Sequence, residues 1–148
     1  MIVKSRTTKE TREFGKLLGE TLKDAFFNQA ILITLSGNLG SGKTTLIQGI
    51  GRGLGIKRQI TSPTFLIMRS YPFSKERKLY HIDAYRIENK KDAAVIEGEK
   101  SIFKDPSNII VIEWPERVRH LLLKEKIVII LSHGKKEFER TIVIRKNA

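Results

Sequence analysis

The chain has 148 residues, 40% of them hydrophobic, so we expect a single domain over residues 1–148 with a substantial core. No apolar run approaches the ~20 residues that span a bilayer, and residues 1–6 lack the apolar stretch of a signal peptide, so a cytoplasmic protein is expected. The absence of cysteine excludes disulfides, thiolate catalysis and cysteine-held metals. The excess of 28 Lys and Arg over 16 Asp and Glu gives a formal charge of +12; it either attracts a polyanion such as nucleic acid or simply solvates the surface.

Residues 1–6 are expected to form a short edge strand or a frayed end. Thr7 and Glu10 fit a capping box, in which hydroxyl and carboxylate each accept from an amide at the start of a helix. The helix should end near Asn28, with Gly15 and Gly19 allowing close packing against a neighbour. Its predicted buried stripe consists of Phe14, Leu17, Leu18, Leu22, Ala25 and Phe26.

The next stretch carries the strongest motif in the chain. An apolar, β-branched run at residues 30–35 predicts a buried strand, and apolar residues at helical spacing over 45–54 predict a helix. Between them, residues 37–44 read GNLGSGKT, which fits the phosphate-loop pattern G-x-x-x-x-G-K-[ST]. Such a loop points its backbone amides at phosphate oxygens, while Lys43 reaches the β- and γ-phosphates and the Thr44 hydroxyl takes one Mg²⁺ position.

A loop rich in hydroxyl groups follows at residues 60–65, where Pro63 disfavours helix at Ser62. A Ser or Thr of this loop either senses the γ-phosphate or its metal, or caps a turn. Residues 65–68 are a candidate strand, and 72–78 a polar hairpin loop. The segment 79–86 then predicts a strand that runs into a turn.

Two side chains of the segment 79–86 bear on function. Asp83 would lie at the end of the strand, where open α/β sheets bind their ligands. We interpret His81 as a packed strand residue, since no partner stands at metal-ligand spacing.

Residues 89–92 read NKKD, which matches the guanine-reading motif N-K-x-D. The match precedes the candidate Walker B strand rather than following it, and it lies in a charged stretch. We therefore interpret it as a helix start or loop and reject GTP specificity. A helix is expected over 93–103.

The four β-branched residues at 109–112 predict a strand buried on both faces, and Glu113 closes it. This is how a Walker B strand ends, with a carboxylate that holds Mg²⁺ directly or through water, or orients an attacking water. Trp114 either walls the site or packs in the core. A short helix is expected over 116–123, and the strands 127–131 and 138–144 should form a hairpin through 133–136.

Four stretches together resemble the TsaE (formerly YjeE) family of small bacterial ATPases in tRNA threonylcarbamoyladenosine biosynthesis. They are GNLGSGKTT at 37–45, TSPT at 61–64, YHIDAYR at 80–86 and EWPERV at 113–118, and the resemblance covers essentially the whole chain. It implies an α/β fold of three layers like that of P-loop NTPases, with a mixed, mainly parallel central sheet and an antiparallel C-terminal hairpin. It also implies a weak ATPase that works with the TsaD and TsaB proteins, which transfer the carbamoyl group to tRNA.

The resemblance implies roles for particular residues. Thr44 and Glu113 would match the magnesium positions, and Asp83 and Thr64, with Lys43, would support turnover near the γ-phosphate. The start of the first helix and the C-terminal hairpin would approach the adenine. ATP or ADP would be bound by Gly37, Asn38, Leu39, Gly40, Ser41, Gly42, Lys43, Thr44 and Thr45.

Three features depart from the family pattern. Asn38 replaces the usual Asp and removes a negative charge beside the phosphates, the usual leucine-proline is missing at 121–124, and the strong positive charge is not a family hallmark. The charge would allow direct contact with tRNA, which the family otherwise makes mainly through its partners.

Two other functions stay open from sequence. A small-molecule kinase of the same fold class would need a lid with paired arginines, for which only Arg117 and Arg119 are candidates. A basic adaptor that binds RNA and keeps a nucleotide as a structural ligand is disfavoured by the intact Lys43, Asp83 and Glu113.

Overall fold

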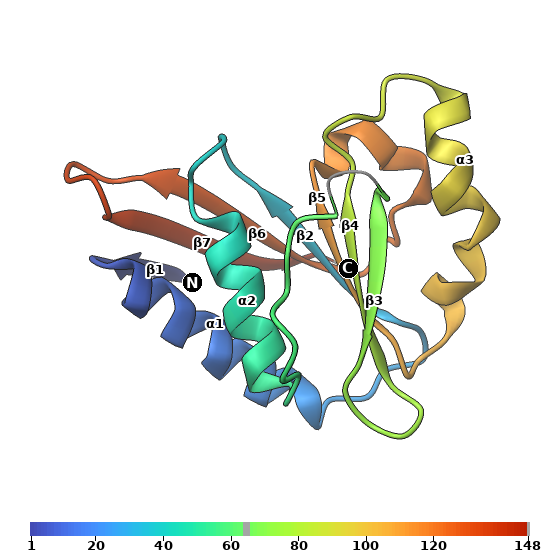
Figure 1. The fold of residues 1–148 in the computed structure, drawn as a ribbon, viewed down its shortest axis with the longest axis horizontal. Coiled ribbons are helices and arrows are strands. Elements are labelled where there is room, and N and C mark those ends of the chain that lie inside the picture. The colour runs from blue at the N-terminus through green and yellow to red at the C-terminus, as the bar shows by residue number, and fades with distance from the viewer. Residues whose placement is uncertain (64–65, 148) are drawn as a thin grey trace.

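The computed structural model describes residues 1–63 and 66–147, which form a seven-stranded sheet with helices on both faces (Figure 1). The strands are β1 (Ile2–Ser5), β2 (Ile31–Ser36), β3 (Met68–Pro72), β4 (Lys78–Asp83), β5 (Ile109–Glu113), β6 (Lys126–His133) and β7 (Arg140–Asn147). The helices are α1 (Thr8–Lys23), α2 (Lys43–Gly53) and α3 (Lys90–Gly98), with 3₁₀ turns η1 (Lys100–Lys104) and η2 (Pro115–Leu121). Within the described ranges no helix is long and apolar enough to cross a membrane.

The strands lie in the order β1-β7-β6-β2-β5-β4-β3. β2 is parallel to β5 and β6, and β4 is parallel to β5, whereas β7 and β3 run antiparallel to their neighbours. The predicted mixed, mainly parallel sheet and its antiparallel C-terminal hairpin are therefore confirmed.

Alternation along β2 divides the core between the two faces of the sheet. Ile31, Ile33 and Leu35 pack with the apolar side chains of α1 and α2, while Leu32 packs with those of α3 and η1. Because β2 is buried on both faces, its sequence is a continuous apolar run rather than an alternating one. The predicted three-layer arrangement follows from this packing.

Helix α1 begins as predicted. Thr7 Oγ1 accepts a hydrogen bond from the amide of Glu10 at 3.0 Å, and Glu10 Oε2 accepts from the amide of Arg6 at 2.7 Å. The helix ends at Lys23, so the predicted end near Asn28 is wrong. The guanidinium of Arg77, from the turn before β4, donates to the carbonyls of Lys23 and Ala25 and holds the chain in a non-helical path there.

The predicted buried stripe of α1 is also partly wrong, because Leu17 is 59% exposed and Phe26 is 71% exposed. The buried residues of the helix are Thr11, Gly15, Gly19 and Leu22. This face meets α2, and a Cβ on Gly15 would overlap the carbonyl oxygen of Leu46. The prediction that Gly15 and Gly19 allow close packing is confirmed. These glycines, rather than the larger apolar side chains of the predicted stripe, form the face of α1 that contacts α2.

Several predicted boundaries move by a few residues. β3 begins at Met68, so the strand expected at 65–68 starts later, and β4 stops at Asp83 because Tyr85 and Ile87 enter a turn. The helix expected at 93–103 is α3 followed by η1, and the last strand begins at 140 rather than 138. Asn89 caps α3 by accepting from the amide of Asp92 at 3.0 Å, which confirms that the N-K-x-D match is a helix start.

Candidate functional site

The candidate site lies where β2, β5 and β4 end side by side. In the sheet register Leu35 is the partner of Glu113, and Glu113 is the partner of Asp83. The phosphate loop leaves the end of β2, so Glu113 stands on the strand next to it and Asp83 on the strand after that. A cavity of about 350 Å³ opens at this edge.

The cavity brings together most of the predicted site residues. Of the predicted set, those that line it are Leu39, Gly40, Gly42, Lys43, Thr44, Thr45, Asp83 and Glu113. Gly37, Asn38 and Ser41 complete the loop without lining the cavity, and Thr64 lies outside the described residues.

The loop depends on glycine at its two ends. Gly42, which precedes α2, has φ of 100°, a left-handed conformation that costs glycine little, and no side chain caps the helix there. The first amides of α2 are therefore free to bind an anion. A Cβ at Gly37 would lie 2.6 Å from both the Leu131 carbonyl oxygen and Ser41 Oγ, so that position has room only for glycine.

Lys43 is nearly buried at the loop, with 6% of its surface exposed. Its Nζ donates to the carbonyls of Gly37 at 2.5 Å and Asn38 at 3.0 Å. Burial lowers the pKa of Lys43, and the negative charges of Glu113, Asp83 and Glu116 partly oppose this shift. The ammonium group thus sits among acidic groups at the place where the motif puts a phosphate.

Glu113 ends β5 as predicted and is 4% exposed. Its Oε2 lies 2.8 Å from Nε2 of His81, a fully buried side chain on the neighbouring strand β4. Since an ionised carboxylate only accepts, Nε2 donates in this pair. His81 is thus a packed strand residue, as the sequence predicted, and the contact of its imidazole with the carboxylate at the end of β5 is what the sequence did not reveal.

Asp83 is held by two donors. Ser62 Oγ donates to Oδ2 at 3.2 Å, and the amide of Tyr85 donates to Oδ1 at 3.0 Å. Ser62 lies in the loop rich in hydroxyl groups and lines the cavity with Asp83. The sequence pattern left open which Ser or Thr of this loop is functional, and the family resemblance pointed to Thr64 rather than to Ser62 of the same TSPT stretch.

Aromatic side chains form one wall of the cavity. Trp114 adopts φ of 57°, which turns the chain sharply after Glu113. Its ring lies 5.0 Å from that of Tyr85, and Lys43 Nζ lies 5.2 Å from its centroid. Trp114 fills both roles considered for it, because it lines the cavity and also packs, partly buried, against the core on the α3 face of the sheet.

The C-terminal hairpin and α1 contribute residues that the sequence did not single out, namely Thr8, Thr11, Phe138 and Arg140. Arg140 binds the phosphate loop directly, its Nε donating to the Ser41 carbonyl at 2.9 Å and its Nη2 to the Gly40 carbonyl at 3.0 Å. No local pattern marks such a contact, because it joins residues 100 positions apart. Both segments, the start of α1 and the C-terminal hairpin, are nevertheless the ones that the family resemblance places near the adenine.

The oxygen atoms at this cavity suit a hard metal cation, whose coordination shell the phosphate oxygens of a nucleotide would complete. No group of three His, Asp or Glu side chains arranged to hold a metal occurs in residues 1–63 and 66–147. Thr44 and the carboxylates of Asp83 and Glu113 offer oxygen ligands at one cavity. Mg²⁺ commonly binds through one or two carboxylates together with substrate phosphates, which fits this arrangement.

The strand–loop–helix unit and the carboxylates beside it define a P-loop NTPase-like fold. The solved structure of YdiB from Bacillus subtilis superposes with a TM-score of 0.76 at 26% identity, covering 100% of this chain and 86% of YdiB. The family model "Threonylcarbamoyl adenosine biosynthesis protein TsaE" matches residues 5–142. The chain belongs to the TsaE family.

Two relatives named "tRNA threonylcarbamoyladenosine biosynthesis protein TsaE" show the extent of the similarity. The protein from Treponema pallidum is 32% identical over 136 residues, which covers 90% of this chain and 94% of the relative. The protein from Synechocystis is 44% identical over 112 residues, covering 75% and 68%.

Proposed function

We propose that this chain is a cytoplasmic, Mg²⁺-dependent ATPase, slow by itself, that serves tRNA threonylcarbamoyladenosine modification together with the TsaD and TsaB proteins. Family membership supports the pathway. The observation that carries the activity is the convergence of Lys43, Asp83 and Glu113 on one cavity at the phosphate loop.

Thr44 and Glu113 would hold Mg²⁺, which when bound neutralises charge on the phosphates. When ATP binds, Lys43 would release the carbonyls of Gly37 and Asn38 and donate to β- and γ-phosphate oxygens instead. Its ammonium would therefore be hydrogen-bonded both before and after the nucleotide binds. Free amides at the start of α2 would bind the remaining oxygens.

Asp83 would orient the attacking water. Ser62 and the Tyr85 amide fix its carboxylate, so it need not reorganise during the reaction. A water oxygen forms a bond to the γ-phosphorus while the bond to the β–γ bridging oxygen breaks; ADP leaves and the water's proton passes to the released phosphate. We assign the part of the cavity lined by Thr8, Thr11 and Phe138 to the base, because Phe138 is half exposed there and offers a stacking surface.

Phosphate release from ATP, without an added acceptor, tests this proposal and separates an ATPase from a kinase. We expect slow release by the chain alone and faster release with the TsaB–TsaD pair of the same organism. Glu113→Ala and Asp83→Ala should each lower turnover by at least about 100-fold while nucleotide affinity changes little.

Lys43→Ala should lower turnover and also weaken nucleotide binding, by roughly 10- to 100-fold, because it removes charge-assisted hydrogen bonds. Glu125→Ala is the matched control, since Glu125 is an exposed carboxylate that does not line this cavity. Near-normal turnover in all three site variants would contradict the assignment, and phosphate transfer only to a metabolite would replace it with a kinase.

A further inference from the structure

The positive charge of the chain is concentrated in one part of it. Between residues 25 and 82 there are eight Lys and Arg residues and one acid, Glu76, so this stretch holds seven of the twelve net charges. Lys43 belongs to the site and Arg77 is buried. The six that remain are at least partly exposed: Arg52, Lys57, Arg58, Arg69, Lys75 and Lys78.

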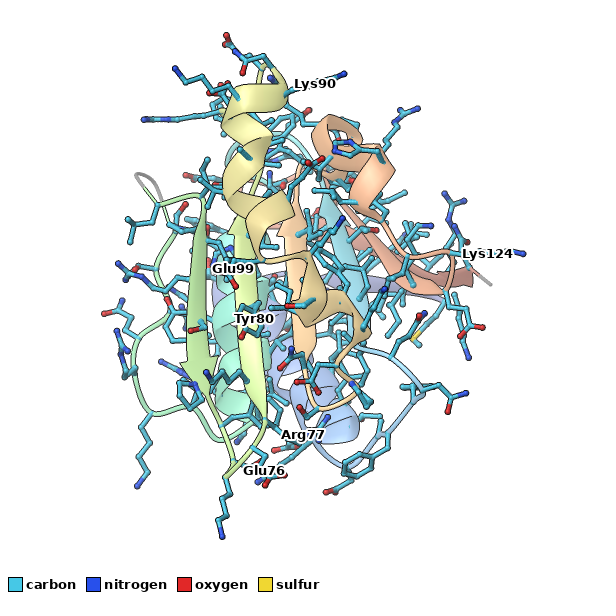
Figure 2. The ribbon with its side chains drawn as sticks, turned by 90° about the vertical axis from the view of Figure 1, so that its right-hand side faces the viewer. Glu76, Arg77, Tyr80, Lys90, Glu99 and Lys124 are labelled. Carbon is cyan, nitrogen blue, oxygen red and sulfur yellow. The ribbon has the colours of Figure 1, made fainter. Side chains whose placement is uncertain are left out.

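These six residues, which we name the basic edge, come from the end of α2, the loop after it and the β3–β4 hairpin. β3 is the last strand of the sheet, and the loop after α2 runs beside it (Figure 1). Figure 2 shows Glu76 and Arg77 at the turn that joins β3 to β4, at one end of the sheet. A groove at this edge is lined by Lys57, Arg58 and residues 71–74.

Two of the arginines are held in place by their neighbours. The Arg58 guanidinium lies 5.4 Å from the ring centroid of Tyr71, and Arg69 Nη1 donates to Thr61 Oγ1 at 3.2 Å. Tyr71 is fully buried in the core, so the ring that supports Arg58 is fixed. Holding a guanidinium before binding lowers the entropy lost when it contacts a ligand.

The surroundings of the basic edge favour nucleic acid over protein. Protein interfaces centre on exposed aromatic or apolar anchors and are depleted in Lys. Two large hydrophobic side chains near the basic edge are exposed, Leu66 at 58% and Phe26 at 71%, and the Phe26 ring is covered in part by the guanidinium of Arg77. Six exposed or partly exposed cations outnumber these two apolar side chains, and such a surface matches nucleic-acid interfaces, which are more polar and much more positive.

We propose that the basic edge binds the phosphate backbone of a folded RNA, independently of its base sequence. That the polyanion is RNA rests on the proposed function in tRNA modification; the surface itself recognises phosphates. The same loop continues from Lys57 and Arg58 to Ser62, which donates to Asp83 in the nucleotide cavity. RNA bound at the basic edge therefore lies against the segment that holds a site carboxylate.

The test measures fluorescence anisotropy of a labelled tRNA transcript titrated with the purified full chain, without nucleotide or partner proteins, at several salt concentrations. The triple variant Lys57→Ala/Arg58→Ala/Lys75→Ala should weaken binding by at least tenfold. It should also flatten the plot of log affinity against log salt by about 2 to 3, since each phosphate contact contributes about 0.7 to 0.9 to the slope.

The control Lys90→Ala/Lys91→Ala/Lys100→Ala removes the same charge from exposed positions around α3, among acids such as Glu97 and Glu99. It should bind within about twofold of wild type. The double variant Lys57→Ala/Lys75→Ala leaves the Arg58–Tyr71 contact intact and should show an intermediate loss, so a folding defect at Arg58 cannot mimic the result.

Equal losses in the two triple variants, or no tRNA binding by the wild type at low salt, would overturn the proposal. Competition by poly-L-glutamate as strong as that by unlabelled tRNA would overturn it in favour of an acidic protein partner. Lys43→Ala should leave tRNA binding unchanged, so failure of the RNA proposal and failure of the ATPase proposal give different patterns.

Discussion

The carboxylate of Glu113 is buried at the tip of β5, and His81 donates to it across the strand pair at 2.8 Å. The other ring nitrogen, Nδ1, is buried without a hydrogen-bond partner in the described part of the chain. Within residues 1–63 and 66–147 the hydrogen bond to Glu113 is therefore the one polar contact of this imidazole. His81 is therefore a positioning residue that fixes the orientation of a candidate Mg²⁺ ligand.

We expect His81→Leu to lower kcat for ATP hydrolysis about 10- to 100-fold while the nucleotide Kd stays within about threefold, because Glu113 keeps its charge but loses its orientation. His81→Gln retains an N–H donor and should recover part of kcat. Steady-state kinetics with a separate nucleotide titration checks this.

His120→Leu is the matched control for His81. His120 also pairs with a glutamate, Glu97, at 2.9 Å, but both side chains are exposed outside the nucleotide cavity. That substitution should leave kcat unchanged. Equal losses for His81→Leu and His81→Gln, or parallel losses of kcat and affinity, would show that the imidazole only fills space.

At the scale of elements, α1 and α2 are held at backbone contact by glycines on both helices. Gly15 faces the Leu46 carbonyl, and a Cβ on Gly49 of α2 would overlap the Arg12 carbonyl oxygen in return. Since α2 starts at the phosphate loop, this contact positions the amides that would bind phosphate.

Gly15→Ala should destabilise the chain by about 1 to 3 kcal/mol, although alanine is the better helix former by about 1 kcal/mol, because the methyl group has backbone atoms to displace. Gly98→Ala is the control: a Cβ there meets nothing within 4 Å, and Gly98 ends α3. Urea denaturation of the two variants measures the difference. A Gly15→Ala variant as stable as the wild type would refute the close contact.

The start and the end of α1 show what sequence can and cannot predict about an element. The start depends on Thr7 and Glu10, three residues apart, and was predicted correctly. The end depends on Arg77, which lies 54 residues from Lys23 and stacks on Phe26 and Phe73. Burial lowers the pKa of Arg77, and the negative charge of Asp24 opposes this shift, so the guanidinium contacts the end of α1 away from water. No sequence pattern near residue 24 indicates this contact.

At the scale of the whole molecule, the same distinction explains which parts of the site were predictable. Glu113 ends β5 and Asp83 ends β4, two adjacent strands that run parallel to β2, and parallel strands end at one edge, so the local motifs predicted that these carboxylates lie at the same edge as the phosphate loop. Arg140 reaches the phosphate loop only because β7 pairs with β6 and β6 with β2. That placement depends on the strand order, which the sequence pattern left undetermined.

Because the cavity is built from α1, the phosphate loop, β4, β5 and the C-terminal hairpin, a bound nucleotide would contact segments from most of the chain. Ligand binding to the folded state alone should then stabilise the whole domain. At 100 times its Kd, Mg²⁺–ADP should contribute about 2.7 kcal/mol and raise Tm by roughly 5 to 10 °C, as measured by differential scanning fluorimetry.

Two changes should remove most of this shift for separate reasons. Chelating Mg²⁺ with EDTA leaves the negative charges of ADP beside Asp83 and Glu113 without a cation, and Lys43→Ala removes the ammonium that offsets the same charges. Lys135→Ala, an exposed lysine in the β6–β7 turn, should keep the full shift. A full shift in EDTA would mean that Thr44 and Glu113 do not hold a metal with the nucleotide, and a full shift in Lys43→Ala would place the phosphates elsewhere on the chain.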